Sequence, residues 1–145
     1  MCVVSESEVL PTWELFLLAN GYGMLRCTLA AGTKPIEELL PPRFVKSICL
    51  SQRAREQDRQ LPAHIKGFRL VIQFAEAFGE GRWASPVARQ TVSKYFNELR
   101  TILKTSSHNR AAFPQLFETK KALGSRLLYH VTIHPAGCPP HPPEA

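Results

Sequence analysis

The segment from Val87 to Lys104 separates its apolar and polar residues onto two faces of a predicted helix. The apolar side chains recur at helical spacing, and this pattern predicts a stripe that packs on a core. These side chains are Val92, Tyr95, Phe96, Leu99, Ile102 and Leu103. Polar and basic side chains occupy the opposite face, where Glu98 is the only acid between Arg89 and Lys104. The chain is 44% hydrophobic, which is ordinary for a globular protein, so we expect a real core for this helix to cover.

Positive charge is concentrated in one part of the chain. The formal net charge is +6, but residues 1–61 contribute none of it because their basic and acidic side chains balance. Residues 86–130 hold eight basic side chains against Glu98 and Glu118, and the flanking segments nearly cancel. A localised basic excess favours a polyanionic partner. A merely soluble surface is the alternative interpretation of this charge.

Cysteine usage and hydropathy bear on the compartment. The four cysteines lie far apart in the sequence and form no CxxC pair. The N-terminal segment is acidic at Glu6 and Glu8, where a secretory signal needs a basic region and then an apolar run. The most apolar stretch, residues 15–29, is interrupted by glycines, Asn20 and Arg26, and it is too short to span a membrane. We therefore expect a cytoplasmic protein with reduced thiols and no membrane association.

The N-terminal part of the sequence predicts a hairpin and two helices after a loose lead-in. Asn20-Gly21 is a strong signal for a tight turn between two apolar runs, so we expect a β-hairpin there. A short helix over residues 12–19 is the alternative. Residues 35–40 predict a short helix that Pro41-Pro42 ends, and residues 43–57 predict a longer one.

Helical patterning returns at Pro62, after a break that is expected to separate two parts of the chain. The apolar residues between Ile65 and Phe78 predict a mostly buried helix that ends at Gly79. Residues 80–85 predict a loop. Ser85-Pro86 is a favourable start for the amphipathic helix, which is expected to run to about Lys104.

The C-terminal part predicts a second hairpin and a disordered tail. Residues 127–133 alternate between apolar and polar, and residues 116–121 are expected to pair with them across a turn at 123–125. Residues 105–110 are polar and predict a loop. The tail, residues 135–145, is rich in proline and is expected to be disordered or polyproline-like.

Two helices followed by a hairpin with a basic tip resemble a winged helix-turn-helix DNA-binding domain. The segment Ala88–Tyr95, ARQTVSKY, is similar to the start of the recognition helix in many bacterial and phage regulators. Phe74–Gly79, FAEAFG, fits the signature that ends the preceding helix in that family. The sequence departs from the family between Gly79 and Val87. Seven residues, 80–86, lie there, where the family normally has a tight turn without any extra residues. The segment Thr91–Arg100 is also similar to the DNA-binding portions of insertion-sequence transposases, although the chain is too short to hold a catalytic nuclease domain as well.

The resemblance implies an α+β fold with a winged helix-turn-helix domain at residues 62–134. Residues 1–61 would then form a small N-terminal α/β lobe for dimerisation or partner binding, and residues 135–145 the tail. The implied partner is double-stranded DNA, bound by a homodimer without any cofactor.

The resemblance also implies which side chains contact DNA. Four near the helix start are expected to enter the major groove: Gln90, Ser93, Lys94 and Asn97. Arg89, Arg100 and Lys104 are expected nearer the phosphates. Lys120, Lys121 and Arg126 are expected at the hairpin tip, where they would touch the backbone or the minor groove as a wing does. Thr91 is expected to cap or pack locally. The alternative is a solvated polar face on an ordinary amphipathic helix.

Other chemistries find little support in the sequence. Zinc-binding residue types occur near the C-terminus at His130, His134, Cys138 and His141, but no second cysteine cluster accompanies them, so we expect exposed histidines and no metal. Trp13, Trp83 and Tyr22 are expected in core or loop packing. No nucleophile–base motif, phosphate loop or paired carboxylate arrangement stands out, so we expect no enzymatic activity.

The function expected from the sequence is therefore sequence-specific DNA binding by a small transcriptional regulator of a phage or other mobile element. One alternative is a protein-interaction module of a mobile element, such as an inhibitor of a host defence complex, that uses a winged-helix scaffold on a protein partner. Another is binding of RNA or single-stranded nucleic acid through stacking on aromatic side chains, namely Tyr22, Trp83, Tyr95 and Tyr129.

Overall fold

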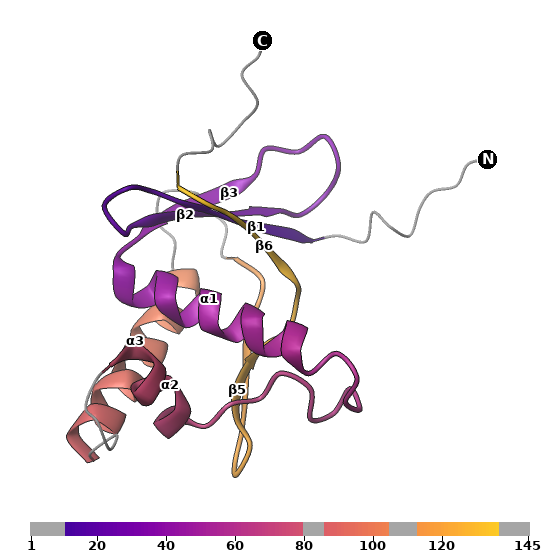
Figure 1. Cartoon of the computed structure of the whole chain (residues 1–145). Coiled ribbons are helices and arrows are strands. Elements are labelled where there is room, and N and C mark those ends of the chain that lie inside the picture. Colours follow the sequence, from indigo (N-terminus) through magenta and orange to yellow (C-terminus); the bar gives the residue numbers. More distant parts are fainter. Residues whose placement is uncertain (1–10, 80–85, 105–112, 137–145) are drawn as a thin grey trace.

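The computed structural model describes residues 11–79, 86–104 and 113–136, which form an α+β fold (Figure 1). Three strands come first: β1 (Thr12–Leu17), β2 (Gly23–Thr28) and β3 (Ile36–Leu40). Three helices follow: α1 (Pro42–Gln57), α2 (Val71–Phe78) and α3 (Pro86–Lys104). Three short strands complete the described part: β4 (Phe117–Lys120), β5 (Gly124–Leu127) and β6 (Val131–His134).

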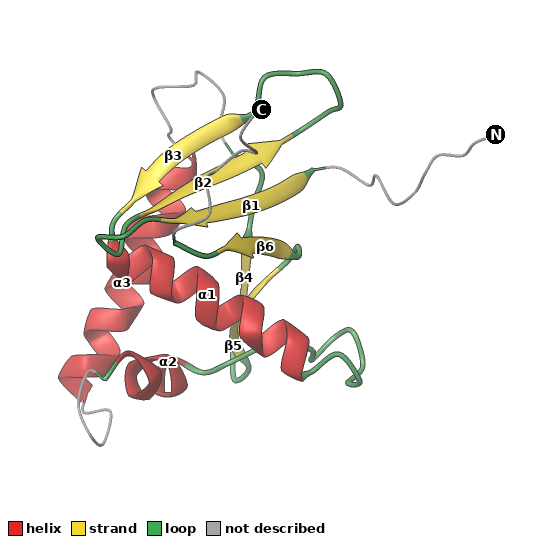
Figure 2. Ribbon diagram, turned by 45° about the horizontal axis from the view of Figure 1, so that its top comes forward, coloured by secondary structure: helices red, strands yellow, loops and turns green. Residues whose placement is uncertain are grey.

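The larger sheet joins the two ends of the chain. Its strand order is β3-β2-β1-β6, and β6 runs parallel to β1 whereas the other neighbours are antiparallel. The β1–β2 turn confirms the predicted hairpin, because Gly21 has a φ of 90° and Asn20 Oδ1 accepts a hydrogen bond of 3.1 Å from the Tyr22 N–H. Strands β4 and β5 form a separate two-stranded hairpin that points away from this sheet (Figure 2).

One hydrophobic core spans the described residues. Helix α1 lies under one face of the larger sheet and also contacts β5, α2 and α3 (Figure 1). The core includes Trp13 and Leu25 from the sheet, Phe44 from α1 and Leu99 from α3, all nearly or fully buried. It is therefore continuous across the expected boundary between residues 61 and 62, and the division into two domains stays a prediction.

The short helix expected at residues 35–40 is wrong, since this segment is strand β3. Ile36 and Leu40 are buried, and the backbone pairs with β2 from Cys27 to Gly23. On the other face of β3, Glu37 accepts a hydrogen bond of 2.7 Å from Arg26. Pairing gives this five-residue segment hydrogen-bond partners that a helix of the same length does not provide.

The buried helix expected from Pro62 starts later, at Val71. Gly67 has a φ of 82°, which a helix does not accommodate, and Arg69 forms a bridge to Ser125 on β5. Both backbone hydrogen bonds of that bridge are short, 3.0 Å from the Arg69 N–H and 2.9 Å from the Ser125 N–H. Tertiary pairing with the hairpin therefore overrides the helical pattern of this segment. The helix does end at Gly79 as predicted, in the left-handed conformation.

The C-terminal hairpin has a different register from the one predicted. β4 pairs with β5 from Phe117↔Leu127 to Lys120↔Gly124, so the turn lies at residues 121–123. The alternating stretch expected as one strand is divided, because β6 leaves the hairpin and pairs with β1.

The predicted helices at 43–57 and from 86 to about 104 are confirmed by α1 and α3. The expected loops at 80–85 and 105–110 and the tail from residue 137 lie outside the described residues.

Candidate nucleic-acid interface

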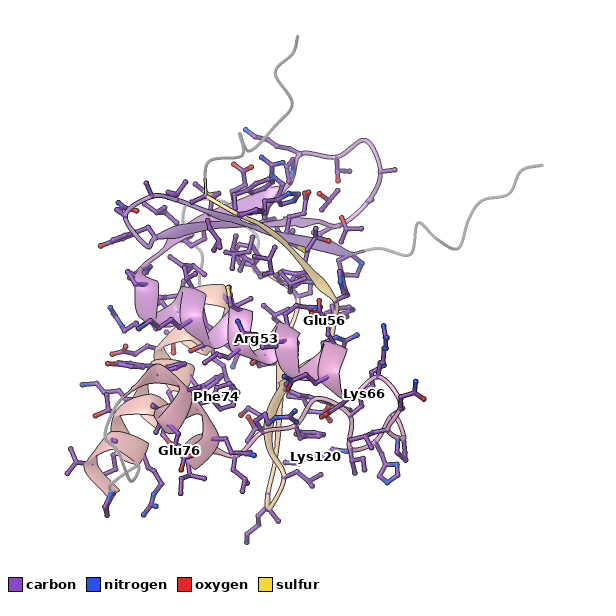
Figure 3. The ribbon with its side chains drawn as sticks, viewed as in Figure 1. Arg53, Glu56, Lys66, Phe74, Glu76 and Lys120 are labelled. Carbon is purple, nitrogen blue, oxygen red and sulfur yellow. The ribbon has the colours of Figure 1, made fainter. Side chains whose placement is uncertain are left out.

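Helix α3 is fixed by its apolar stripe. Its buried residues are Ala88, Val92, Phe96, Leu99 and Leu103. Phe74 from α2, labelled in Figure 3, meets the edge of the Phe96 ring at a centroid distance of 4.9 Å. The Phe117 ring of β4 meets Phe96 at 5.3 Å. Contacts from both α2 and the hairpin therefore set the orientation of α3.

The exposed face of α3 gathers half of the predicted contact residues. A shallow surface depression beside the start of α2 is lined by Arg89, Gln90, Ser93, Lys94 and Asn97, together with Val71 and Pro86. Gln90, Lys94 and Asn97 are exposed, and the other two polar side chains are partly exposed. Within the part of the chain that the structure describes, no carboxylate lines this depression. This surface, which we call the α3 face, is thus a polar and cationic patch on a rigid helix.

Glu98 does not neutralise the α3 face. Its Oε1 lies 3.6 Å from Arg43 Nε, so this acid pairs with a cation from α1. Thr91 donates a hydrogen bond of 3.0 Å to the Val87 carbonyl oxygen, in agreement with the local role expected for it. The sequence pattern gave no indication of the contact with Arg43, because the two residues are brought together only by the packing of α1 on α3.

Arg100 is tied to the hairpin. It donates a hydrogen bond of 3.1 Å to Asn97 Oδ1 and a second one to Thr119 Oγ1 of β4. The Thr119 hydroxyl in turn lies 2.8 Å from the Ser125 hydroxyl on β5. Burial lowers the pKa of the Arg100 guanidinium. Arg100 therefore connects α3 to β4 and holds the amide of Asn97, a role that helical spacing alone does not predict.

The hairpin presents two lysines near its turn. Lys120, labelled in Figure 3, and Lys121 are both exposed. Lys120 Nζ lies 3.7 Å from Glu118 Oε2. Two residues here are left-handed: Ala122 in the turn, with a φ of 71°, and Gly124 at the start of β5, with a φ of 100°. Lys104, the last residue of α3, is exposed at the far end of that helix.

The expectation that Arg126 lies at the hairpin tip is wrong. Its Nε donates 2.9 Å to Glu118 Oε1, and its Nη1 donates to the carbonyl oxygens of Ala63 and, at 2.9 Å, Lys66. The guanidinium also lies 4.3 Å from the centre of the Phe68 ring. Because the turn lies at residues 121–123, Arg126 lies within β5. There it holds the 62–69 segment against the hairpin.

Replacing Arg126 by Ala is expected to lower the free energy of unfolding by about 2 kcal/mol, because two carbonyl oxygens and Glu118 lose a charged donor. Equilibrium unfolding in urea measures this loss. Lys121→Ala is the matched control in the same hairpin and is expected to change stability by less than about 0.5 kcal/mol. Equal losses in the two variants would contradict the anchoring role of Arg126.

Asp58 anchors the end of the same segment, at Gly67 and Arg69. Its carboxylate accepts hydrogen bonds of 2.6 and 3.1 Å from Arg69 and one of 3.1 Å from the Gly67 N–H. These contacts, the Arg69 hydrogen bond foremost, lower the pKa of Asp58 although burial opposes them. Asp58 is therefore part of the scaffold that holds Arg69 against β5.

Asp58→Asn is expected to destabilise the protein by about 1–3 kcal/mol, since the charged acceptor of Arg69 is lost. Because the folded-state pKa is lowered, the contribution of Asp58 is complete above about pH 4 and disappears as the pH falls through the folded value. Unfolding curves measured between pH 7 and pH 2.5 test this. The difference between wild type and Asp58→Asn should shrink with falling pH, whereas Glu76→Gln on the exposed side of α2 should change little at any pH.

The remaining candidate residues are dispersed. His134 Nε2 lies 3.1 Å from Glu14 Oε2, and the His134 ring stacks on Phe16. Among residues 11–79, 86–104 and 113–136, no three His, Cys, Asp or Glu side chains cluster as metal ligands; Cys138 and His141 lie outside these ranges. Trp13 is buried between Phe113 and Tyr129 as core packing, while Trp83 is outside the described residues.

Comparison of the chain with protein-family models, with curated proteins and with solved structures gave no match. A search of the described helices for one long and apolar enough to cross a membrane found none.

Proposed function

We propose that this protein is a winged-helix protein that binds double-stranded DNA in a sequence-specific way, as a small regulator of transcription. The observation that carries the proposal is the α3 face, where one depression that no carboxylate of the described residues lines is surrounded by Arg89, Gln90, Ser93, Lys94 and Asn97. Arginine, lysine, glutamine and asparagine make the hydrogen bonds that base edges and phosphates accept or offer. An α-helix with its side chains is about as wide as the major groove, roughly 12 Å.

The order of elements around α3 supports a winged helix. The chain passes in order through α1, a bridged segment at Arg69, α2, α3 and the β4–β5 hairpin. The Arg69↔Ser125 bridge pairs the segment before α2 with β5, beside the two strands of the hairpin. On this interpretation the DNA-binding unit spans residues 42–127 and includes α1, rather than starting at residue 62. Its wing is β4–β5, and Lys120 and Lys121 are the side chains that would meet the DNA backbone.

Two side chains of the α3 face have distinct roles in the proposal. Lys94 is exposed and has no ion pair within the described residues, so it is free to contact a phosphate or a guanine edge. Asn97 Oδ1 already accepts a hydrogen bond from Arg100, which leaves the amide N–H groups to donate to an acceptor on a base. Replacing either residue by Ala should therefore relax sequence preference at one position of the site.

Selection from a pool of random duplexes, followed by gel shifts of the recovered fragments at low salt, tests the proposal. We expect a defined motif in the recovered pool and weaker discrimination within it by Asn97→Ala. Absence of any duplex binding at low salt, with genomic fragments included, would overturn DNA binding as the function.

A second candidate function, binding of a protein partner, is supported by the outer face of the larger sheet. No described helix covers this face (Figure 1). Leu39 on β3 is 48% exposed there, beside Arg26 with its partners Glu37 and Glu14. A second copy of the chain or another protein would cover Leu39 on this face. Recovery of a stable protein complex from a chain that binds no duplex would favour this candidate over the first.

A further inference from the structure

A half-enclosed groove lies between the C-terminal half of α3 and the strand β4, next to the α3 face. It encloses about 420 Å³, a size that suits a small organic molecule. Its apolar lining comes from Leu103, Phe113, Leu116 and Phe117. Two cations, Arg100 and Lys104, also line it, and no carboxylate does so within the described part of the chain. The groove thus combines an apolar wall with positive charge.

Among the described residues, Arg100 has no anionic partner. Its hydrogen bonds go to the neutral oxygens of Asn97 and Thr119, and its guanidinium lies 6.0 Å from the centre of the Phe96 ring. A guanidinium carries five N–H donors, so at least half of them remain for another acceptor. Burial lowers its pKa, which means that its charge is partly removed from water without compensation by an opposite charge. Such a group favours an anion that arrives with its own apolar body.

We propose that this groove binds a small carboxylic acid with an alkyl or aryl chain, whose carboxylate pairs with Arg100 while its chain lies against Leu103 and Phe117. Lys104 at the rim adds attraction for the same charge. A carboxylate matches the planar fork of a guanidinium. An alcohol or an amine of the same length lacks the charge that Arg100 requires.

Titration of the full chain with octanoate and with 4-phenylbutyrate, followed by amide chemical shifts and by calorimetry, tests the proposal. We expect a Kd of about 0.1–1 mM for at least one acid. The largest shifts should fall on the residues that line the groove, and the matched alcohols should bind at least about tenfold more weakly. Arg100→Gln should weaken binding by about tenfold or more, whereas Lys94→Gln, which removes the same charge from the α3 face, should leave it unchanged.

Several outcomes would overturn the proposal: no binding of either acid, equal binding of octan-1-ol, shifts centred on another surface, or retained affinity in Arg100→Gln. Because Arg100 also joins α3 to β4, Arg100→Gln carries a risk of poor folding. Arg100→Lys is then the second variant, since it keeps the charge but not the planar fork, and it should weaken binding severalfold. The amide chemical-shift changes of the wild-type chain locate the site without any variant.

A second measurement rests on the proposed DNA binding and asks whether the groove regulates it. A carboxylate on Arg100 competes with Asn97 Oδ1 for the guanidinium, so a bound acid should change the affinity for the selected duplex. The same acid should have no effect on DNA affinity in Asn97→Ala. Binding of the acid without any change in DNA affinity would refute the coupling alone, whereas failure of all duplex binding would bear on the proposed function and not on the groove.

Discussion

Replacing Gly124 by Ala is expected to lower the free energy of unfolding by at least about 3 kcal/mol, which few single substitutions do. A Cβ atom at Gly124 would lie 1.9 Å from the Arg69 carbonyl oxygen and 2.5 Å from its carbonyl carbon. The φ of Gly124 is 100°, a backbone conformation that side chains disfavour in addition. Since the obstructing atoms belong to the backbone, either the Arg69↔Ser125 bridge must open or the hairpin must move. Urea unfolding and hydrogen exchange at Arg69 and Ser125 measure both effects.

Gly32→Ala is the control that separates steric contact from backbone strain. Gly32 has a similar left-handed φ of 82°, but no atom lies within 4 Å of a Cβ placed there. Gly32→Ala should therefore lower the free energy of unfolding only by the cost of a left-handed backbone conformation, about 1–2 kcal/mol. Equal losses in the two variants would mean that the close approach of β5 to the 62–69 segment does not contribute to stability.

The elements that the sequence predicts well are those whose signals are local. The Asn20-Gly21 turn fixes the β1–β2 hairpin through its own backbone conformation, and the apolar stripe from Val92 to Leu103 marks the buried side of α3. Five of the ten predicted contact residues share one depression for the same reason. Positions on one side of a helix stay together wherever the helix is placed.

The errors arise where distant segments pair. Residues 35–40 form a strand because β2 offers an open edge, and residues 62–70 are not helical because Arg69 bonds to Ser125. Likewise, β6 leaves the predicted hairpin for β1, which is far away in the sequence. The position of Arg126 is not predictable for the same reason, since its partners Ala63, Lys66 and Phe68 are about 60 residues away in the sequence. Local periodicity carries no information about such partners.

The double variant Arg89→Gln, Lys94→Gln is expected to weaken binding to the selected duplex about a hundredfold at low salt, with little change in stability. Each side chain is a cation on the α3 face without an ion pair among the described residues, and each is expected to neutralise one phosphate or base acceptor. Each lost phosphate contact should reduce the slope of log K against log salt concentration by about 0.9, whereas a lost base contact should leave the slope unchanged. Fluorescence anisotropy over a series of salt concentrations measures affinity and slope together.

The matched control is Lys34→Gln, Arg59→Gln, which removes the same net charge from two exposed positions outside α3 and the hairpin. Lys34 lies in the loop between β2 and β3, on the opposite side of the molecule from α3 (Figures 1 and 2). If α3 enters the groove, the control should change affinity by less than about threefold at about 0.1 M salt, because charges farther from the DNA than the Debye length of about 10 Å are then screened. Equal losses in the two double variants would show that only overall charge attracts DNA. An unchanged affinity in the α3 variant would exclude the α3 face as the contact surface, even if the chain binds DNA elsewhere.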